Sequence, residues 1–450
     1  MLTFYSADAP PNRRARALHH YSRLDYLGPP GTVRCTRRKG RCRRRLFRRC
    51  YSVIVSGMAG ALRNVFFVDG VRTPFGKAGP QGLFWHTRAD DMAAKTIREL
   101  LSRNPGLPPD RVHDVVFAAT AQVGDQGLTL GRNAALLAGL PASVPGFAVD
   151  RMCAGALTAI TSAAGEIAWG AADVTIAGGV EHMGHHPMGE EIDFNPRYVA
   201  ERLVDPSAVT MGATAENLHD RFPHLTKEAA DRYAVESHRR AAAAWQNGVM
   251  RATVTPMTVW SEDGWRLAER DEFLRPDTSM EALAELRTPF RPGGRVTPGN
   301  SAGLTDGAAA CILASGDAAE ELGLDPKLRL AGFAYAGVEP EFMGLGPVPA
   351  TLKVLEQTGL GLDDINLFEV NEPFAVQVLT WLDGLGLSAD DPRLNPYGGA
   401  LACGHPLAAT GARLVAQLAY AMGERPGARY GLTALCIGFG MGAALVWERV

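Results

Sequence analysis

The chain has 450 residues, of which 46% are hydrophobic and 21% charged, a composition typical of a globular protein with a large core. It contains no run of about 18 uncharged apolar residues, so we expect no integral membrane association. The net charge of −2 hides an asymmetry: residues 1–57 contain 14 Lys and Arg against two acidic residues, giving 14 − 2 = +12, and the remainder therefore carries −2 − 12 = −14. An acidic body disfavours nucleic acid as its partner.

The basic segment 1–57 includes RRKGRCRRRLFRR at 37–49 and has too few apolar residues to offset the entropy of ordering, so we predict disorder. A nucleic-acid-binding arm, an Arg-rich organelle presequence and a secretory signal are three interpretations. We favour a fourth, in which the segment is translated upstream sequence and the working protein begins at Met58, directly before a patterned strand. The mass of the natural N-terminus distinguishes them, because a start at residue 1 contradicts the fourth.

Cysteine usage supports the same division of the chain. The sequence has three cysteines in the basic segment and four widely spaced ones in the body: Cys35, Cys42 and Cys50, then Cys153, Cys311, Cys403 and Cys436. This spacing provides neither a disulfide scaffold nor a CxxC zinc motif. We therefore expect reduced thiols, no bound metal and a cytoplasmic location.

The body alternates between strand-like and helix-like patterns from Arg63 onward. In chain order, the sequence predicts a strand at 65–68, a helix at 90–102, a strand at 115–119, an apolar segment at 142–149, a helix of small residues at 154–168 and a strand at 174–177. Alternating strands and helices, with glycines at the strand ends, predict an α/β fold with a largely parallel sheet.

Residues 183–290 differ from this pattern, because they contain few strand-like runs, several polar helical segments such as 227–248, and frequent proline and charge. We interpret them as an insertion that carries part of a binding site. The α/β pattern returns after Asn300, where 300–310 reads as a polar turn that opens an alanine-rich helix.

Two short matches at nearly one offset indicate an internal repeat. Residues 114–118 resemble 364–368, and Cys153 is matched 252 residues later by His405. If the two halves are duplicated, equivalent loops face each other across a pseudo-twofold axis, one with a thiol and the other with an imidazole.

Cys153 lies in VDRMCAGALTA, where a strand ends and a helix of small residues begins. The positive end of a helix stabilises a thiolate, so this position suits a nucleophile, although most free cysteines are simply buried small side chains. His405 lies in GGALACGHPLAATGAR at 398–413, where dense glycine lets backbone and ligand approach closely. A lone histidine is more often structural, whereas one in so glycine-rich a loop is more often catalytic.

Two further segments contain candidate groups. Cys436 begins CIGFGMG, whose glycines expose backbone N–H groups that could form an oxyanion hole, or which form a plain hairpin. Asn371 and Glu372 follow the predicted strand at 366–368, and buried polar groups there require partners. They could orient a water or a substrate carbonyl, or they could pair with the backbone.

These blocks, in this order, resemble the thiolase family, and the resemblance extends from about Val65 to Val450 without the basic segment. The segments GGVEHMGHHPM at 178–188 and FMGLGPVPA at 342–350 are most similar to the degradative branch, the 3-ketoacyl-CoA thiolases, and especially to the thiolase subunit of bacterial fatty-acid oxidation complexes. The resemblance implies two duplicated α/β halves with mixed five-stranded sheets in αβαβα layers. We divide the chain into 58–320, which includes a loop domain at 183–290, and 321–450.

The resemblance also implies a role for each matching residue. Cys153 is the acyl-accepting nucleophile, His405 its base and Cys436 the second acid and base. Asn371 would hold a water that forms one oxyanion hole with His405, and the backbone N–H groups of Cys153 and Gly438 would form the other. The family positions that line the CoA and acyl channel correspond to Met211, Arg275, Met343 and Phe374.

Three departures from the family pattern lie in this channel. Ala302 stands where biosynthetic thiolases have a serine that bonds pantetheine, so this contact is absent or Ser301 replaces it. Pro373 replaces the family's usual alanine, and Thr210 replaces a histidine of the biosynthetic branch. The departures affect the expected acyl-chain preference rather than the chemistry.

The implied reaction is cleavage of a 3-ketoacyl-CoA by CoA in fatty-acid β-oxidation, with CoA as co-substrate and no tightly bound cofactor. Alternatives are a biosynthetic acetyl-CoA acetyltransferase, a decarboxylating ketoacyl synthase and a non-catalytic CoA- or lipid-binding protein. Cys436 argues against the synthase, and the complete set of reactive groups argues against a silent binder. Family resemblance further implies a homodimer or homotetramer, with a hydratase/dehydrogenase subunit as a candidate partner.

Overall fold

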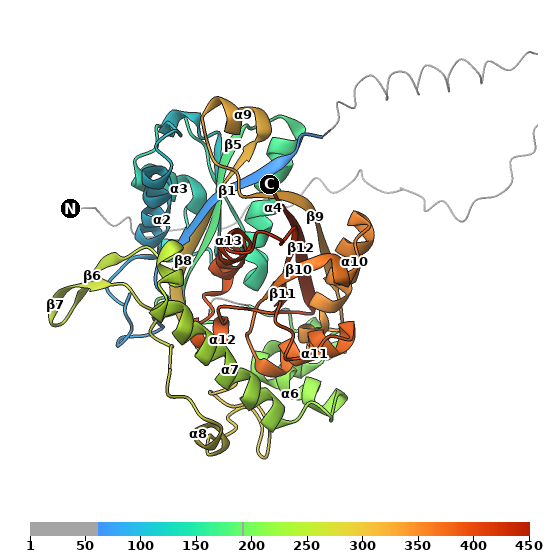
Figure 1. The fold of residues 1–450 in the computed structure, drawn as a ribbon. Coiled ribbons are helices and arrows are strands. Elements are labelled where there is room, and N and C mark those ends of the chain that lie inside the picture. Colours follow the sequence, from blue (N-terminus) through green and yellow to red (C-terminus); the bar gives the residue numbers. More distant parts are fainter. Residues whose placement is uncertain (1–61, 191–192) are drawn as a thin grey trace, which may run out of the picture. The chain divides into compact units, whose positions relative to one another are not determined.

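A computed structural model describes residues 62–190 and 193–450 (Figure 1). The predicted disordered segment 1–57, its three cysteines and Met58 lie outside these residues. Within them, one mixed sheet forms the centre of the fold. In spatial order its strands are β4 (Phe147–Val149), β3 (Asp114–Ala118), β5 (Val174–His182), β8 (Thr305–Ser315), β1 (Val65–Arg72), β9 (Leu328–Gly337), β12 (Met441–Arg449), β11 (Tyr430–Ile437) and β10 (Ile365–Val370), and β2 (Gly76–Lys77) pairs with β8.

The sheet consists of two similar parts that meet at β1 and β9. The order β1-β8-β5-β3-β4 in one part corresponds to β9-β12-β11-β10 in the other, and the two parts are joined by only two antiparallel residue pairs, Phe66↔Arg329 and Phe67↔Leu328. The expected α/β fold with two similar halves is confirmed.

Two details differ from the sequence-based expectation. The sheet is mixed rather than largely parallel, because only the pairs β3–β4, β3–β5 and β10–β11 are parallel. In the second half the counterpart of β4 is a single bridge between Phe368 and Leu394. The chain cannot continue as a strand there, since Asn395 has a left-handed φ of 40° and Pro396 has no N–H for a ladder.

Helices cover both faces of each part and fill the space between the parts, which gives five layers (Figure 1). The central layer contains α4 (Gly155–Trp169) and α13 (Thr410–Gly423), and one apolar cluster joins both helices to both parts of the sheet. The outer layers contain α2 (Ala89–Arg103) and α3 (Leu130–Ala138) on one side, and α10 (Pro347–Thr358) and α11 (Ala375–Leu385) on the other.

The alanine-rich segment after Asn300 forms the strand β8 and not the predicted helix. All eleven residues of β8 are buried, and the strand pairs with β1 and β5. Its alternate residues face opposite cores: Ala310 and Ile312 pack toward α2, and Cys311 and Leu313 toward the central helices. Small residues let helices approach both faces of the sheet, and this tertiary packing overrides the helical preference of alanine.

The segment between β5 and β8 contains the insertion that the sequence predicts. Its elements are α5 (Arg197–Ala200), α6 (Met211–Arg221), α7 (Lys227–Gln246), the hairpin β6 (Met257–Ser261) and β7 (Gly264–Ala268), and α8 (Met280–Ala284). Two short helices lie elsewhere, α9 (Gly316–Glu321) and α12 (Ala400–Cys403). Every helix in the described parts of the chain is too short or too polar to cross a bilayer.

A buried ion pair fixes the insertion to the sheet. Arg72, at the end of β1, donates two hydrogen bonds of 2.6 and 2.8 Å to the carboxylate of Asp271, which follows β7. Asp271 also accepts the backbone N–H of Phe75 at 2.9 Å. Both charged side chains are almost fully buried, so the segment after β7 has little freedom to move.

We therefore predict that Asp271→Ala lowers the free energy of unfolding by about 3–5 kcal/mol, because Arg72 is left charged, buried and unpaired. Thermal unfolding followed by circular dichroism measures the change. Glu201→Ala is the control, since it breaks the exposed Arg197–Glu201 pair and should leave the midpoint unchanged. An equal shift in both variants would contradict the importance of the buried pair.

Candidate active site

Cys153 lies between β4 and α4, in a single 3-10 turn of Met152–Ala154. Met152 has a left-handed φ of 46°, and its backbone N–H donates to the Asp150 carboxylate at 2.6 Å. Such a conformation costs a non-glycine residue roughly 1–3 kcal/mol and persists only where the surroundings enforce it. The strained residue fixes the direction from which Cys153 enters the helix.

Burial keeps Cys153 protonated in the resting protein. The side chain is 9% exposed, and loss of solvation raises the pKa of the thiol to about 11. Backbone N–H groups of Gly438 and of Cys153 itself lower this pKa, whereas the nearby carboxylates of Glu181 and Asp150 raise it. At neutral pH the sulfur therefore carries a proton that a base must remove before it can attack.

His405 is held on both sides of its ring and along its backbone. Its backbone N–H donates to Thr305 Oγ1 at 3.0 Å, and its Nδ1 lies 2.6 Å from Thr410 Oγ1. The Thr410 hydroxyl donates its single proton to the Pro406 carbonyl at 3.1 Å, so it accepts from Nδ1–H. This network assigns the lone pair to Nε2, which lies 3.3 Å from the amide nitrogen of Asn371.

The imidazole is neutral in these surroundings. Burial, together with the positive charge of the buried Arg413, lowers the pKa of His405 to about 3. A neutral imidazole with its lone pair on Nε2 is able to accept a proton, as the predicted base requires.

Cys436 lies near the end of β11 and is also buried. Its strand contacts the turn Met152–Ala154, so the two cysteines lie on adjacent segments. Burial raises the pKa of the Cys436 thiol well above the usual value, and the charge that Cys153 acquires on ionising raises it further. Gly438 follows in the turn to β12. A Cβ atom there would lie 2.9 Å from the sulfur of Met152, so this turn packs directly against the Met152 side chain beside the Cys153 loop.

The two polar residues after β10 have different surroundings. The Asn371 amide points at His405, and its oxygen has no protein partner among the described residues. Glu372 instead accepts hydrogen bonds from Tyr233, Ser237 and Asn395 at 2.6–2.9 Å. Asn371 therefore faces the reaction space, whereas Glu372 joins three segments of the scaffold.

Most of the predicted channel residues lie together. Met211, Met343 and Phe374 share one apolar cluster with Cys436. Ser301 pairs with Phe374 in an isolated bridge, and its hydroxyl donates to the Thr297 carbonyl at 2.7 Å.

Two predicted binding residues do not join this cluster. The Ala302 backbone N–H donates to the Pro373 carbonyl, so its backbone is tied to the loop that precedes Phe374. Arg275 lies apart on an exposed segment, where its backbone N–H donates to His238.

The sequence did not indicate three residues that shape the site. Thr410 and Thr305 hold His405, and Met152 carries the strained backbone. Thr410 lies five residues after His405, within the same glycine-rich block, which is a usable signal. Thr305 lies in the segment 300–310, where the sequence wrongly predicts the start of a helix. No sequence pattern indicates that a methionine adopts a left-handed backbone conformation.

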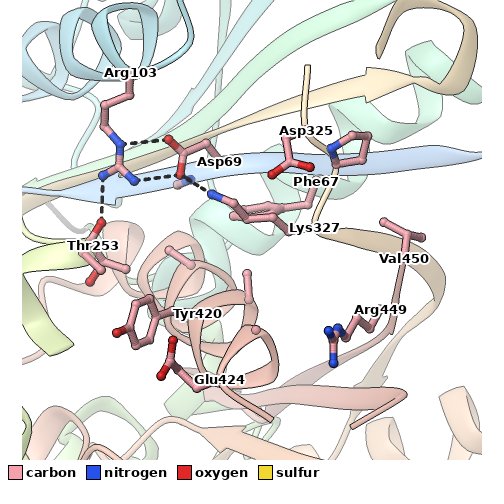
Figure 2. Close-up of a pocket in the computed structure, with 16 residues that line it drawn as sticks. Phe67, Asp69, Arg103, Thr253, Asp325, Lys327, Tyr420, Glu424, Arg449 and Val450 are labelled. Carbon is pink, nitrogen blue, oxygen red and sulfur yellow. Dashed lines mark hydrogen bonds and ion pairs between the residues drawn. The ribbon is translucent and has the colours of Figure 1, made fainter. Parts of the chain in front are cut away.

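A surface cavity of about 320 Å³ lies elsewhere and contains none of the predicted catalytic residues. Figure 2 shows that three of its charged groups pair with one another, because Asp69 accepts from both Arg103 and Lys327. All four described cysteines are free, and no group of His, Cys, Asp or Glu side chains in residues 62–190 and 193–450 is arranged to hold a metal ion.

Comparisons with known proteins agree with this geometry. The family descriptions "Thiolase, N-terminal domain" and "Thiolase, C-terminal domain" match residues 65–317 and 324–449. The chain is 44% identical over 392 residues to a 3-ketoacyl-CoA thiolase of Klebsiella pneumoniae and 43% identical to one of Salmonella typhimurium, with 86% of this chain and all of each relative covered.

Solved structures are similar as well. Human mitochondrial 3-ketoacyl-CoA thiolase is 33% identical with a TM-score of 0.79, and the acetyl-CoA acetyltransferase of Bacillus anthracis is 36% identical with a TM-score of 0.78. Each comparison covers 87% of this chain and all of the other.

We predict that Thr410→Val redistributes the proton between the two nitrogens of His405, because Nδ1–H loses its acceptor. In ¹⁵N NMR spectra the unsubstituted protein should show the Nδ1–H tautomer of His405 and no titration between pH 5 and 9. Thr358→Val, at the end of α10, is the control, since that hydroxyl bonds only backbone carbonyls. Titration of His405 near pH 6.5 would contradict the assignment.

Proposed function

The chain belongs to the thiolase family, and from this premise we propose that it cleaves 3-ketoacyl-CoA with CoA, giving acetyl-CoA and a shortened acyl-CoA. One observation carries the proposal: the turn that contains Cys153 contacts both the strand of Cys436 and the turn that follows His405, so two buried, protonated thiols lie beside a neutral imidazole with its lone pair on Nε2. These three groups supply a nucleophile, an acid and a base. The relatives at 43–44% identity carry the name of the same activity.

In the first step, Nε2 of His405 accepts the proton of Cys153 as the sulfur attacks the 3-keto carbon. The new C–S bond converts the carbonyl to an oxyanion. The backbone N–H groups of Cys153 and Gly438 are the donors assigned to this oxygen, and both lower the pKa of the Cys153 thiol.

In the second step, the oxyanion collapses and the bond between the second and third carbons breaks. Its electron pair forms the enolate of acetyl-CoA, which Asn371 and the protonated His405 stabilise, with a water held by Asn371. Cys436 then gives its proton to the enolate carbon. A thiol with a strongly raised pKa suits this step, because it retains its proton until a strong carbon base appears.

In the third step, the Cys436 thiolate takes the proton of an incoming CoA thiol. The CoA sulfur attacks the thioester on Cys153, and the departing Cys153 sulfur recovers its proton from His405. All three groups return to their resting protonation states. Because the first product leaves before the second CoA reacts, ping-pong kinetics are expected.

We further propose that CoA acts as co-substrate without a tightly bound cofactor or metal, since the three side chains already supply the acid, base and nucleophile. Met211, Met343 and Phe374 would line the acyl and pantetheine channel beside Cys436. By family resemblance, we assign Arg275, Ser301 and Ala302 to the binding of CoA. A homodimer or homotetramer in the cytoplasm, with a hydratase/dehydrogenase subunit as partner, completes the proposal.

A thiolysis series over acyl length tests the function. We predict that 3-ketoacyl-CoAs with acyl chains longer than four carbons are cleaved at rates equal to or above the rate for acetoacetyl-CoA. The rate is measured as the loss of absorbance of the magnesium enolate of the substrate. Activity confined to acetoacetyl-CoA would favour the biosynthetic acetyltransferase that the Bacillus relative represents. No thiolysis at any length would contradict both.

Two substitutions separate the assigned roles. We predict that Cys153→Ala abolishes covalent acylation by an acyl-CoA, as measured by intact-protein mass. Cys436→Ala should still be acylated by a simple thioester but should lose carbon–carbon cleavage by at least about 100-fold, because the enolate lacks its proton donor. Cys311→Ala, in the core of β8, should retain both activities. An acylated Cys153→Ala protein, or full cleavage by Cys436→Ala, would contradict the assignments.

A further inference from the structure

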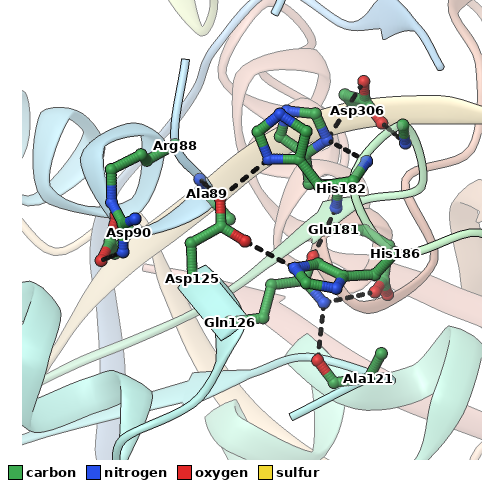
Figure 3. Close-up of polar contacts among 12 residues, drawn as sticks. Arg88, Ala89, Asp90, Ala121, Asp125, Gln126, Glu181, His182, His186 and Asp306 are labelled. Carbon is green, nitrogen blue, oxygen red and sulfur yellow. Dashed lines mark hydrogen bonds and ion pairs between the residues drawn. The ribbon is translucent and has the colours of Figure 1, made fainter. Parts of the chain in front are cut away.

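Glu181 is a buried carboxylate that the proposed chemistry does not use. It lies near the end of β5 in the GGVEHMG block, and its side chain is 1% exposed. The neighbouring Gly179 lies directly under the central helices, since a Cβ atom there would lie 2.2 Å from the Ala408 carbonyl oxygen. Side chains alternate along a strand, so Glu181 faces the same central layer. Figure 3 shows it beside Gln126.

Both oxygens of this carboxylate accept hydrogen bonds from neutral donors. One accepts the Thr120 hydroxyl at 2.8 Å and the Gln126 amide at 3.2 Å. The other accepts the backbone N–H groups of Ala408 at 3.0 Å and of Thr120 at 3.4 Å. The carboxylate has no hydrogen bond or ion pair to a cation among the described residues, so these four bonds stabilise its charge.

A glutamine could not replace this carboxylate without loss. The backbone N–H of His182 donates to the oxygen of Gln126, which turns the NH₂ group of Gln126 toward Glu181 (Figure 3). One side of the carboxylate thus faces that NH₂ group, and the other side faces two backbone N–H groups. In either orientation, the NH₂ of a glutamine at 181 would oppose an N–H donor.

The bond to Ala408 reaches the segment that carries the base. Ala408 belongs to the turn Leu407–Ala409, between His405 and the start of α13. The same alanine packs against Gly155, where a Cβ would lie 3.0 Å from that of Ala408, two residues after Cys153. Glu181 thus connects a strand of the first half to the loop of the second half, at the point where that loop passes the nucleophile.

We propose that Glu181 is a positioning residue that fixes the His405 loop against the Cys153 loop, so that Nε2 stands where it accepts the thiol proton. This inference rests on the proposed function. It predicts that the loss of Glu181 slows proton removal through His405, whereas binding of acyl-CoA is unchanged. The direct effect of its charge has the opposite sign, because the Glu181 carboxylate raises the pKa of Cys153 and its removal favours ionisation of the thiol.

The experiment is a double-mutant cycle on the acetylation of Cys153 by acetyl-CoA, with rates taken by rapid quench and intact-protein mass. Glu181→Gln should slow acetylation about 10- to 100-fold and change the KM for acetyl-CoA by less than about 2-fold. In a His405→Ala background the same substitution should not slow acetylation further, because the group it positions is absent and the loss of its charge favours the Cys153 thiolate.

Asp69→Asn provides the matched control. Asp69 is a buried carboxylate that also accepts a backbone N–H, that of Gly70, but it lines the surface cavity that contains none of the predicted catalytic residues. This variant should keep the acetylation rate of the unsubstituted protein. If Glu181→Gln does not fold, Glu181→Asp, which keeps the charge on a shorter side chain, enters the same cycle with a partial loss expected.

Two outcomes would overturn the inference: an unchanged acetylation rate in the Glu181 variants, or equal losses with and without His405. A general structural role would produce the second of these. If the unsubstituted protein is not acetylated at all, the proposed function fails, and the inference fails with it. If the unsubstituted protein is acetylated, but the Glu181 and His405 substitutions slow acetylation independently of each other, only the positioning role is refuted and the proposed function stands.

Discussion

The close approach of the two central helices is the constraint on which the rest of the site depends. Near the start of α4, Gly155 leaves no room for a side chain against Ala408. Near the start of α13, a Cβ at Gly411 would lie 2.6 Å from the backbone nitrogen of Leu157. Cys153 and His405 lie just before these contacts, in equivalent places of the two halves. A thiol and an imidazole that are 252 residues apart in sequence meet because two glycines let two helices touch.

The same packing determines the protonation states. Burial disfavours every charged form, so it raises the pKa of both catalytic thiols and lowers the pKa of the imidazole. A thiolate–imidazolium pair is therefore not stored in the resting site. The proton leaves Cys153 as the sulfur bonds to carbon, when the negative charge moves to an oxygen that faces backbone N–H groups. The dry site thus couples ionisation of the nucleophile to the presence of substrate.

Much of this arrangement could be predicted from the sequence, and the failures have physical reasons. Glycine-rich loops after apolar runs indicated Cys153, His405 and Cys436, because the chemistry there requires close backbone approach. The strand β8 was predicted as a helix, since local preference cannot show that both faces of an alanine-rich segment will be covered. The contacts of Glu181 also leave no pattern, because its partners lie 55 to 227 residues away along the chain.

The repeated halves differ most at one equivalent connection. Between β11 and β12 only residues 438–440 intervene, whereas between β5 and β8 the chain runs through 183–304. The ends of that long excursion are adjacent, since His182 and Asp306 are paired in register. Lengthening a connection whose ends stay together adds little entropic cost to folding. The length of the segment is therefore weakly constrained between its anchors, such as the buried Arg72–Asp271 pair, whereas the short connection leaves no freedom to the turn that carries Gly438.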